Sequence, residues 1–285
     1  MIPFYKTARK KGLRPILGCE VYVAVNHHKE KKQITTSTGK KWGYHHLVLL
    51  VQNEVGYKNL MKLISIGYLE GFYYRPRVDK QLLRQYNEGL ICTSGCLAGE
   101  VNHFASQGDT DSARKAALEY AEIFPDRFYL ELQNHEIPEE AAARKILKSL
   151  SKELHIPLIA TNDCHYCREE DWEAHDVLFC LGTDKNRSDT NRIRYEPRQF
   201  YIKTVDEMMR LFPDTPDALE NTVKIAESCN LEIPMGEYHL PAFPVPGENG
   251  NADPDVYLRS LCERGLLERY PNITQEIRKR LDFEL

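Results

Sequence analysis

The chain has 285 residues, 42% hydrophobic and 28% charged, a balance typical of a folded protein with one large core or two smaller ones rather than of a disordered chain. Its formal net charge of -4 argues against nucleic-acid binding through bulk positive charge but leaves a local basic patch open. Eight cysteines without a signal peptide or a compact, evenly spaced framework predict reduced thiols in the cytoplasm, and no apolar run approaches the roughly 18 residues of a membrane span.

The first expected elements are a helix and a buried strand. We expect the helix over residues 3–11 and the strand over 16–25, with Glu20 inside its apolar run, where a carboxylate needs a partner. Because a domain rarely begins with a helix already under way, we expect a further piece of protein upstream. The polar, lysine-rich residues 27–41 are expected to form an exposed loop.

Two histidines open the next strand, expected over residues 44–51. Alternation places His45 and His46 on opposite faces of the sheet, and a hydrogen-bonded structural role is the more common one for such a pair. A helix is expected over 54–67. The sequence GFYYRPRVD at 71–79 then offers aromatics and arginines that either stack on bases and grip phosphate or simply pack the loop together.

A short strand within residues 89–100 breaks into a turn that carries Cys96, either a metal ligand or, by default, a small buried side chain. Two helices each lead into a strand, 110–123 into 128–132 and 138–154 into 157–161. This alternation predicts parallel pairing and an α/β barrel or layered sheet, in which chemistry gathers at the carboxyl ends of strands.

The stretch LIATNDCHYC, residues 158–167, places Asp163 and His165 two positions apart where a buried strand ends. Strand alternation points both to one side, where a carboxylate oxygen and a ring nitrogen hold zinc, manganese or iron. The alternative is an aspartate that caps a turn beside an ordinary surface histidine. Cys96 also follows a strand, and Glu131 and His135 lie near another strand end, which favours a site.

After about residue 204 the pattern of the sequence changes from alternating strands and helices to helices and a connector. Four further helices are expected, over 205–212, 216–229, 255–270 and 274–285, with a proline- and glycine-rich connector at 234–254 between the second and the third. The CxxC of Cys164 to Cys167 lacks a second pair at zinc-ribbon spacing. GxxxxGKS, GxGxxG and GxSxG motifs are absent from the sequence, as is a pair of acids arranged like those of a polymerase palm.

With these residues laid out, the sequence resembles the PHP (polymerase and histidinol phosphatase) domain at the start of bacterial replicative DNA polymerase III alpha subunits. The resemblance covers nearly the whole chain and runs, in order, through FYKTARKKGLRPILGCEVYVA, HHLVLLVQNEVGYKNL, GFYYRPRVD, TSGCLAGE, FYLELQNH, IPLIATNDCHY, DALENTVKIAESCNLEIP and RLDFEL.

The resemblance implies a distorted, seven-stranded β/α barrel of PHP type over residues 1–204, holding up to three metals. Residues 205–285 would be a helical connector and the start of the polymerase core. Carried over by motif, the metal ligands are the bridging Glu20, His46 rather than His45, Cys96 after SG, and the closing pair Asp163 and His165. Cys96 departs from free-standing relatives, which have His there, and Glu131 and His135 lie near the site without being ligands.

The family also has an HxH pair and an Asp-His pair before the FYK helix, and this sequence does not contain them. We therefore expect a barrel that is incomplete at its amino end, without its first strand and several ligands, and a piece inactive alone. The resemblance implies a parent that is a DNA-directed DNA polymerase, a nucleotidyltransferase that extends DNA from deoxynucleoside triphosphates in replication. Its palm carboxylates and their magnesium would lie outside this chain.

In the intact parent, the PHP metals (zinc, manganese or iron) would support 3'-5' exonuclease or phosphodiesterase activity. Implied partners are DNA, other replicase subunits including a proofreading exonuclease, and the sliding clamp, with no membrane. The alternative is a non-catalytic scaffold that stabilises the polymerase and docks the proofreading subunit. A free-standing PHP phosphatase predicts a chain ending near residue 204, which the helical extension speaks against, and an error-prone paralogue stays open.

Overall fold

The computed structural model describes residues 1–32, 34–35, 41–236, 240–241, 243–246 and 253–285. It divides into two compact units, Met1–Ile233 and Pro234–Leu285. Parts of the loop expected over 27–41 and of the connector expected over 234–254 lie outside the described residues. Within them, no helix combines the length and the apolar character that a membrane crossing requires.

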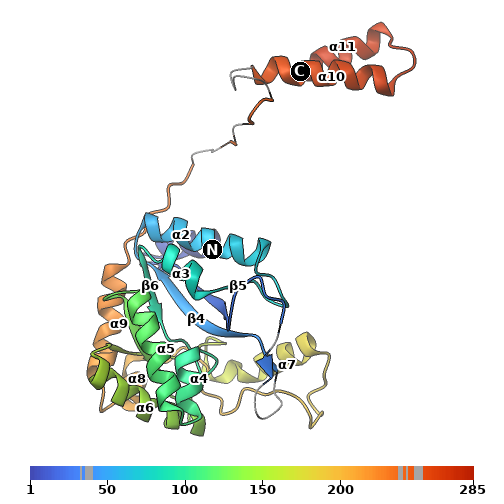
Figure 1. The fold of residues 1–285 in the computed structure, drawn as a ribbon. Helices are drawn as coiled ribbons and strands as arrows, with labels where there is room; N and C mark the ends of the chain where they lie inside the picture. Colours follow the sequence, from blue (N-terminus) through green and yellow to red (C-terminus); the bar gives the residue numbers. More distant parts are fainter. Residues whose placement is uncertain (33, 36–40, 237–239, 242, 247–252) are drawn as a thin grey trace. The chain divides into compact units, whose positions relative to one another are not determined.

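A six-stranded sheet in the order β5-β1-β4-β6-β7-β8 organises the first unit (Figure 1). Its strands are β1 (Gly18–Ala24), β4 (Tyr44–Val51), β5 (Arg77–Val78), β6 (Leu90–Thr93), β7 (Phe128–Leu132) and β8 (Leu158–Ala160). A separate pair joins β2 (Ile34–Thr35) and β3 (Lys41–Trp42). The mixed α/β class expected from the sequence is confirmed, and β4 and β7 have the predicted bounds.

The parallel pairing expected where helices alternate with strands is confirmed for β6, β7 and β8, but it does not extend to the whole sheet. The pairs β1–β5, β6–β7 and β7–β8 are parallel, but β4 runs antiparallel to both β1 and β6. The amino end of β4 therefore lies at the same edge as the carboxyl ends of its neighbours. This direction brings a residue near the start of β4 to the edge where the other strands finish.

Nine α-helices of the described residues belong to the first unit: α1 (Ile2–Lys10), α2 (Glu54–Leu69), α3 (Lys80–Gln85), α4 (Glu100–Ser106), α5 (Thr110–Ile123), α6 (Pro138–Leu154), α7 (Trp172–Thr183), α8 (Val205–Leu211) and α9 (Pro216–Ser228), with a 3-10 turn at Glu169–Asp171. The sequence analysis did not anticipate α3, α4 and α7. By compactness, the unit includes α8 and α9, which the sequence assigned to the second domain.

The two faces of the sheet are covered differently. On one face, Leu47 and Leu49 of β4 are buried in the main core, against α2 and α4. On the other face, Ile225 of α9 packs with Ile91 and Ile159 in a smaller cluster. Asn221 of the same helix donates a hydrogen bond to the carbonyl of β8 residue Leu158, at 2.8 Å. Because α9 covers one end of this face, the end that carries the start of β4 is left for a site.

One loop expectation was wrong, and an alternative that the sequence left open is decided for one arginine. His28, expected in an exposed loop, is buried, and its ring lies against Asp79. In the GFYYRPRVD stretch, Arg77 is 2% exposed and its guanidinium donates to the carbonyls of Gly71, His28 and Glu30. Since those donors are used inside the fold, Arg77 packs the loop and is not available to phosphate, whereas Arg75 of the same stretch is exposed.

The second unit contains α10 (Pro254–Arg269) and α11 (Gln275–Glu284), close to the predicted helices. Their facing sides are joined by ion pairs between Arg259 and Asp282, at 2.8 Å, and between Arg278 and Glu263, at 3.2 Å. Asp253 caps α10 through its side chain, which accepts from the N–H of Asp255. These two helices therefore pack as an antiparallel-type hairpin held partly by charge.

Candidate metal centre

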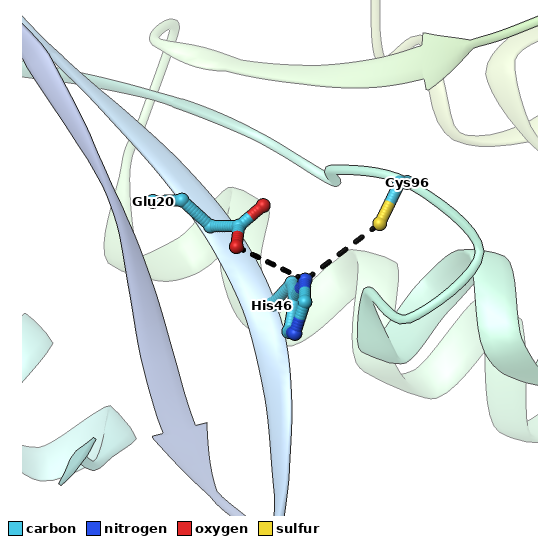
Figure 2. Close-up of side chains that lie close together, drawn as sticks. All are labelled: Glu20, His46 and Cys96. Atoms are coloured by element: carbon cyan, nitrogen blue, oxygen red, sulfur yellow. Dashed lines mark hydrogen bonds and ion pairs between the residues drawn. The ribbon is translucent and has the colours of Figure 1, made fainter. Parts of the chain in front are cut away.

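Three predicted ligands converge on one face of the sheet. In the β1–β4 register Glu20 is opposite Val48 and His46 is opposite Tyr22, so Glu20 and His46 are diagonal neighbours on the same face. The Nδ1 atom of His46 lies 3.1 Å from Oε1 of Glu20 and 3.7 Å from Sγ of Cys96 (Figure 2). Donor atoms of these three residues all lie within 4.8 Å of one another.

Cys96 reaches this position because β6 ends in a tight turn. Gly95 has φ +72°, a conformation that favours glycine, and Asn102 holds the turn by donating to the Gly95 carbonyl and accepting from Ser94. A Cβ at Gly99 would meet the carbonyl oxygen of Ser94 at 1.9 Å, so the chain can close there only with glycine. Burial, with smaller contributions from nearby carboxylates, raises the pKa of the Cys96 thiol to about 12.

The predicted closing pair, Asp163 and His165, lies beside this group. Among the described residues, its donor atoms do not come within 4.8 Å of those of all three members. Strand β8 ends at Ala160, so Asp163 and His165 are not aligned by strand alternation as the sequence suggested. His165 Nδ1 instead contacts the Asp163 carbonyl at 2.8 Å. Burial raises the pKa of the Asp163 carboxyl. His165 and His135 lower this pKa, whereas Glu20 raises it further, so the carboxyl lies near the cluster.

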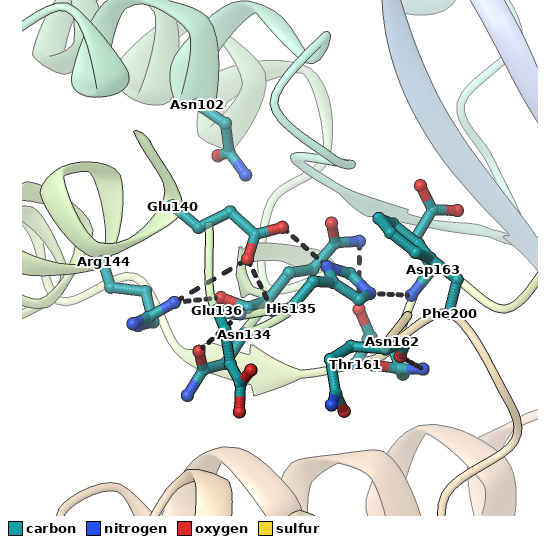
Figure 3. A network of polar contacts seen from close by, with 12 residues as sticks. Asn102, Asn134, His135, Glu136, Glu140, Arg144, Thr161, Asn162, Asp163 and Phe200 are labelled. Atoms are coloured by element: carbon teal, nitrogen blue, oxygen red, sulfur yellow. Dashed lines mark hydrogen bonds and ion pairs between the residues drawn. The ribbon is translucent and has the colours of Figure 1, made fainter. Parts of the chain in front are cut away.

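A buried pair positions Asp163. His135 is 1% exposed, its Nδ1 lies 2.6 Å from Glu140, and its Nε2 accepts the backbone N–H of Asp163 at 3.2 Å (Figure 3). Because Glu140 fixes the proton on Nδ1, Nε2 stays an acceptor and holds the start of the Asp163 loop. His135 therefore supports a predicted ligand and does not present a free nitrogen of its own.

The other nearby candidates are also used inside the fold. Glu131 accepts hydrogen bonds from Thr93, Gln133 and Thr161, which fills much of its acceptor capacity. His45 points to the opposite face, where its ring lies 5.5 Å from that of His103, and burial lowers its pKa to about 4. The structure thus places His46 in the group and His45 against α4.

An aromatic wall beside His165 was missed by the sequence analysis. The ring of His165 lies 4.4 Å from Tyr195, 5.7 Å from His175 and 5.6 Å from Phe200, and Phe200 also stacks on His135 at 4.2 Å. Burial raises the pKa of Tyr195, and Asp163, Cys96 and Glu20 raise it further, so its phenol also borders the candidate ligands. The signal was the alternation of arginine and aromatic residues in RIRYEPRQFY, residues 192–201.

The group of Glu20, His46 and Cys96 fits a divalent ion. Around a tetrahedral zinc ion, nitrogen, oxygen and sulfur ligands stand roughly 3.3–3.6 Å apart, close to the 3.1 and 3.7 Å observed. Imidazole with thiolate favours zinc, whereas carboxylates that bridge ions also suit manganese or iron. The donor chemistry therefore admits all three metals that the sequence suggested.

A second group of ligand-type side chains follows the carboxyl ends of β1 and β5. His27, His28 and Asp79 also bring donor atoms within 4.8 Å of one another. Asp79, however, caps α3 by accepting the N–H of Leu82 and takes two contacts from His28, with its backbone N–H at 2.9 Å and Nδ1 at 2.5 Å. Its oxygens are already satisfied by the protein, so we assign this group a structural role.

Comparisons with known proteins identify a domain family and several relatives. Residues 1–135 match the family model described as the PHP domain. Along almost its whole length, the chain is similar to proteins named DNA polymerase III subunit alpha. It is 42% identical to the DNA polymerase III subunit alpha of Treponema pallidum over 99% of its length, 45% to that of Borreliella burgdorferi over 100%, and 40% to that of Thermus aquaticus over 95%.

The chain spans about a quarter of the length of these relatives, 24%, 24% and 22% respectively. The PHP match ends at residue 135, before Asp163 and His165, whereas the similarity to the alpha subunits continues through them. The six-stranded sheet is consistent with part of a PHP-type β/α barrel. The family resemblance drawn from the sequence is thereby confirmed.

Proposed function

We propose that this chain is the PHP domain, with an adjoining helical segment, of a DNA-directed DNA polymerase that acts in replication in the cytoplasm. Relatives named DNA polymerase III subunit alpha along almost the whole chain support this. DNA, deoxynucleoside triphosphates, a proofreading exonuclease and the sliding clamp are the proposed partners of the whole protein. The magnesium-dependent joining of nucleotides is proposed for parts of that protein that these residues do not include.

The PHP edge itself is proposed to bind divalent metal through Glu20, His46, Cys96, Asp163 and His165. The observation that supports this most is the approach of a carboxylate, an imidazole and a thiol at 3.1 and 3.7 Å. Bound there, divalent ions would supply a metal-activated water and charge stabilisation for phosphodiester hydrolysis. Glu20 and His46 would hold the ions from the sheet, and the His135–Glu140 pair would keep Asp163 in place.

Metal content tests the ligand assignment. The purified chain is dialysed against equal micromolar zinc, manganese and iron, and bound metal is measured by elemental analysis beside His46→Ala, Asp163→Asn and a control, Asp217→Asn, which removes an exposed acid of α9. We expect at least one bound equivalent in the chain and the control, none in His46→Ala and less in Asp163→Asn. If the unaltered chain retains no metal, the assignment is wrong, and the scaffold function becomes the better proposal.

Hydrolysis tests the activity separately. In the intact parent protein, we expect a 3'-end-labelled single strand to lose nucleotides only if the metal site is loaded, and His46→Ala to abolish that loss, whereas the 285-residue chain is expected to be inactive alone. A loaded site without any hydrolysis would retain the metal assignment and exclude exonuclease activity for the PHP edge of the parent.

A further inference from the structure

A cavity of about 210 Å³ lies beside the candidate metal centre, between α7 and the segment that follows it. Four arginines line it, Arg187, Arg192, Arg194 and Arg198, against two carboxylates, Asp176 and Glu196. The lining therefore carries a formal excess of two positive charges. The cavity is therefore locally basic, although the net charge of the whole chain is -4 and does not indicate it.

The carboxylates do not neutralise the arginines evenly. Asp176 is taken by Arg192, at 2.5 and 2.8 Å, and by Arg187, at 3.4 Å. Arg194 reaches Glu196 only at 4.0 Å, and among the described residues no carboxylate lies within ion-pair distance of Arg198. Two guanidinium groups thus keep donors for an anion, and the fork of N–H groups suits phosphate.

One donor in the cavity wall is also left unsatisfied. The Arg192 side chain is 5% exposed, and its Nε has no hydrogen-bond partner among the described residues. A buried donor without a partner costs free energy that a bound acceptor can recover. The wall of the cavity therefore presents an arginine already oriented by Asp176 and still short of one acceptor.

Aromatic rings supply the second half of the cavity. Arg198 stacks on Trp172, with its guanidinium carbon 3.3 Å from the ring centroid, and Tyr195 lies 5.4 Å from Phe179 and 5.1 Å from His175. Aromatic faces beside arginines are the combination that binds the base and phosphate of single-stranded nucleic acid. The volume is below the roughly 300 Å³ at which drug-sized pockets begin, so it suits one nucleotide unit and not a duplex.

The cavity shares a wall with the metal edge. Tyr195 and His175 line it, and both rings also contact His165, at 4.4 and 5.7 Å. We propose that this cavity binds one nucleotide unit of a single strand, with the phosphate at Arg194 and Arg198 and the base against Trp172. This deepens the proposed function by naming the substrate class of that edge, but the binding itself requires no metal.

Binding is tested on the 285-residue chain in EDTA, by fluorescence anisotropy of a 5'-fluorescein-labelled (dT)6 strand, with free dTMP as competitor. Arg198→Gln and Trp172→Ala remove a phosphate contact and the stacking surface. Arg210→Gln is the control, because it removes one exposed positive charge of α8 that does not line the cavity. Thermal unfolding checks that each variant is folded.

We expect Trp172→Ala to weaken binding at least about fivefold. Arg198→Gln should weaken it and reduce the magnitude of the salt dependence, d log K/d log[salt], by about 0.7, whereas Arg210→Gln should leave both unchanged. Competition by dTMP would assign the site to a free nucleotide unit, and (dT)6 binding without competition would assign it to a strand. Absence of binding, or an equal loss in the folded control and cavity variants, would overturn the proposal.

The outcome is separable from that of the metal proposal. If (dT)6 binds in EDTA but the chain retains no metal after dialysis, the metal proposal fails and the nucleotide site stands. If metal content is unchanged in folded Trp172→Ala and Arg198→Gln, and their affinities for (dT)6 are also unchanged, the metal proposal stands and the nucleotide site is excluded.

Discussion

Two groups of ligand-type side chains in the first unit are similar in composition, but their side chains make different contacts. Glu20, His46 and Cys96 lie on a sheet face, and the hydrogen bonds and ion pairs described for Glu20 and His46 side chains are with members of the group. In His27, His28 and Asp79, by contrast, the carboxylate accepts a helix N–H, a loop N–H and a ring contact.

The difference teaches that proximity of ligand-type residues does not define a metal site. What matters is how many lone pairs of the side chains remain free of hydrogen bonds to the rest of the protein. Asp79 is 3% exposed, and its carboxylate oxygens accept hydrogen bonds within the fold. The Glu20 side chain, by contrast, is 40% exposed and faces the open edge. The first group can therefore exchange its internal contacts for an ion at little cost to the fold.

The largest effect that tests this comparison is expected from Asp79→Asn. The amide can still cap α3, but it replaces the oxygen that accepts the backbone N–H of His28 and contacts its ring, and leaving such buried groups unsatisfied costs roughly 2 kcal/mol of unfolding free energy. Urea unfolding measures this loss. Asp109→Asn is the matched control, because Asp109 caps α5 in the same way without a buried histidine, and it should change stability by less than about 0.5 kcal/mol.

The same pair predicts a pH dependence. Burial raises the pKa of Asp79, but the hydrogen bonds from the His28 backbone and ring and from Leu82 N–H outweigh it and set the pKa below its ordinary value of 3.8. A lowered pKa in the folded state contributes stability above the unfolded value and loses it as pH falls through the folded one. The difference between wild type and Asp79→Asn should thus shrink below about pH 4. A difference independent of pH would show that the carboxylate charge is not what holds the loop.

A smaller effect is expected at the metal edge from Glu140→Gln. The change keeps the shape of the side chain but weakens its hold on the His135 proton, and His135 Nε2 accepts the N–H of Asp163. Loss of such supporting contacts lowers metal affinity by about 10- to 100-fold. Zinc competition against a chromophoric chelator measures it, with exposed Glu139→Gln as the control from the same helical turn. Equal affinities for the two variants would remove Glu140 from the support of the site.

Much of the fold was predictable because its long elements have strong periodicity. The helices over 110–123 and 138–154 and the strand over 128–132 have the predicted bounds. Short α4, of seven residues, follows a small-residue turn and has little room for a period. In α7 the apolar Leu178 and Leu181 are exposed at 66% and 75%, so no apolar stripe marked it as an amphipathic helix.

The site was predictable only in part, because strand direction and distant contacts are not local properties. His46 was expected near the start of its strand, away from the carboxyl end, and the antiparallel course of β4 is what brings it to the edge where the neighbouring strands end. Asp163 depends on His135, which is 28 residues away. Composition also left two uses open for the arginines of residues 71–79, and only the fold shows that Arg77 is buried in carbonyl contacts, whereas the arginines of 187–198 line a cavity.

The smallest expected effect separates local stability from the metal edge. Thr204 caps α8: its Oγ1 accepts the N–H of Glu207 at 3.3 Å, and the Glu207 carboxylate accepts the N–H of Thr204 at 2.7 Å. Thr204→Ala should cost about 1 kcal/mol in urea unfolding, and Thr204→Ser, which keeps the hydroxyl, much less. Metal content should stay unchanged in both, because neither side chain contacts the three converging donors. The Phe200 carbonyl accepts the N–H of His165 and so helps to position it. If Thr204→Ala also lost metal, the segment that contains Phe200 would be coupled to the cap. The metal site would then depend on local fold contacts, as the Asp79 group does.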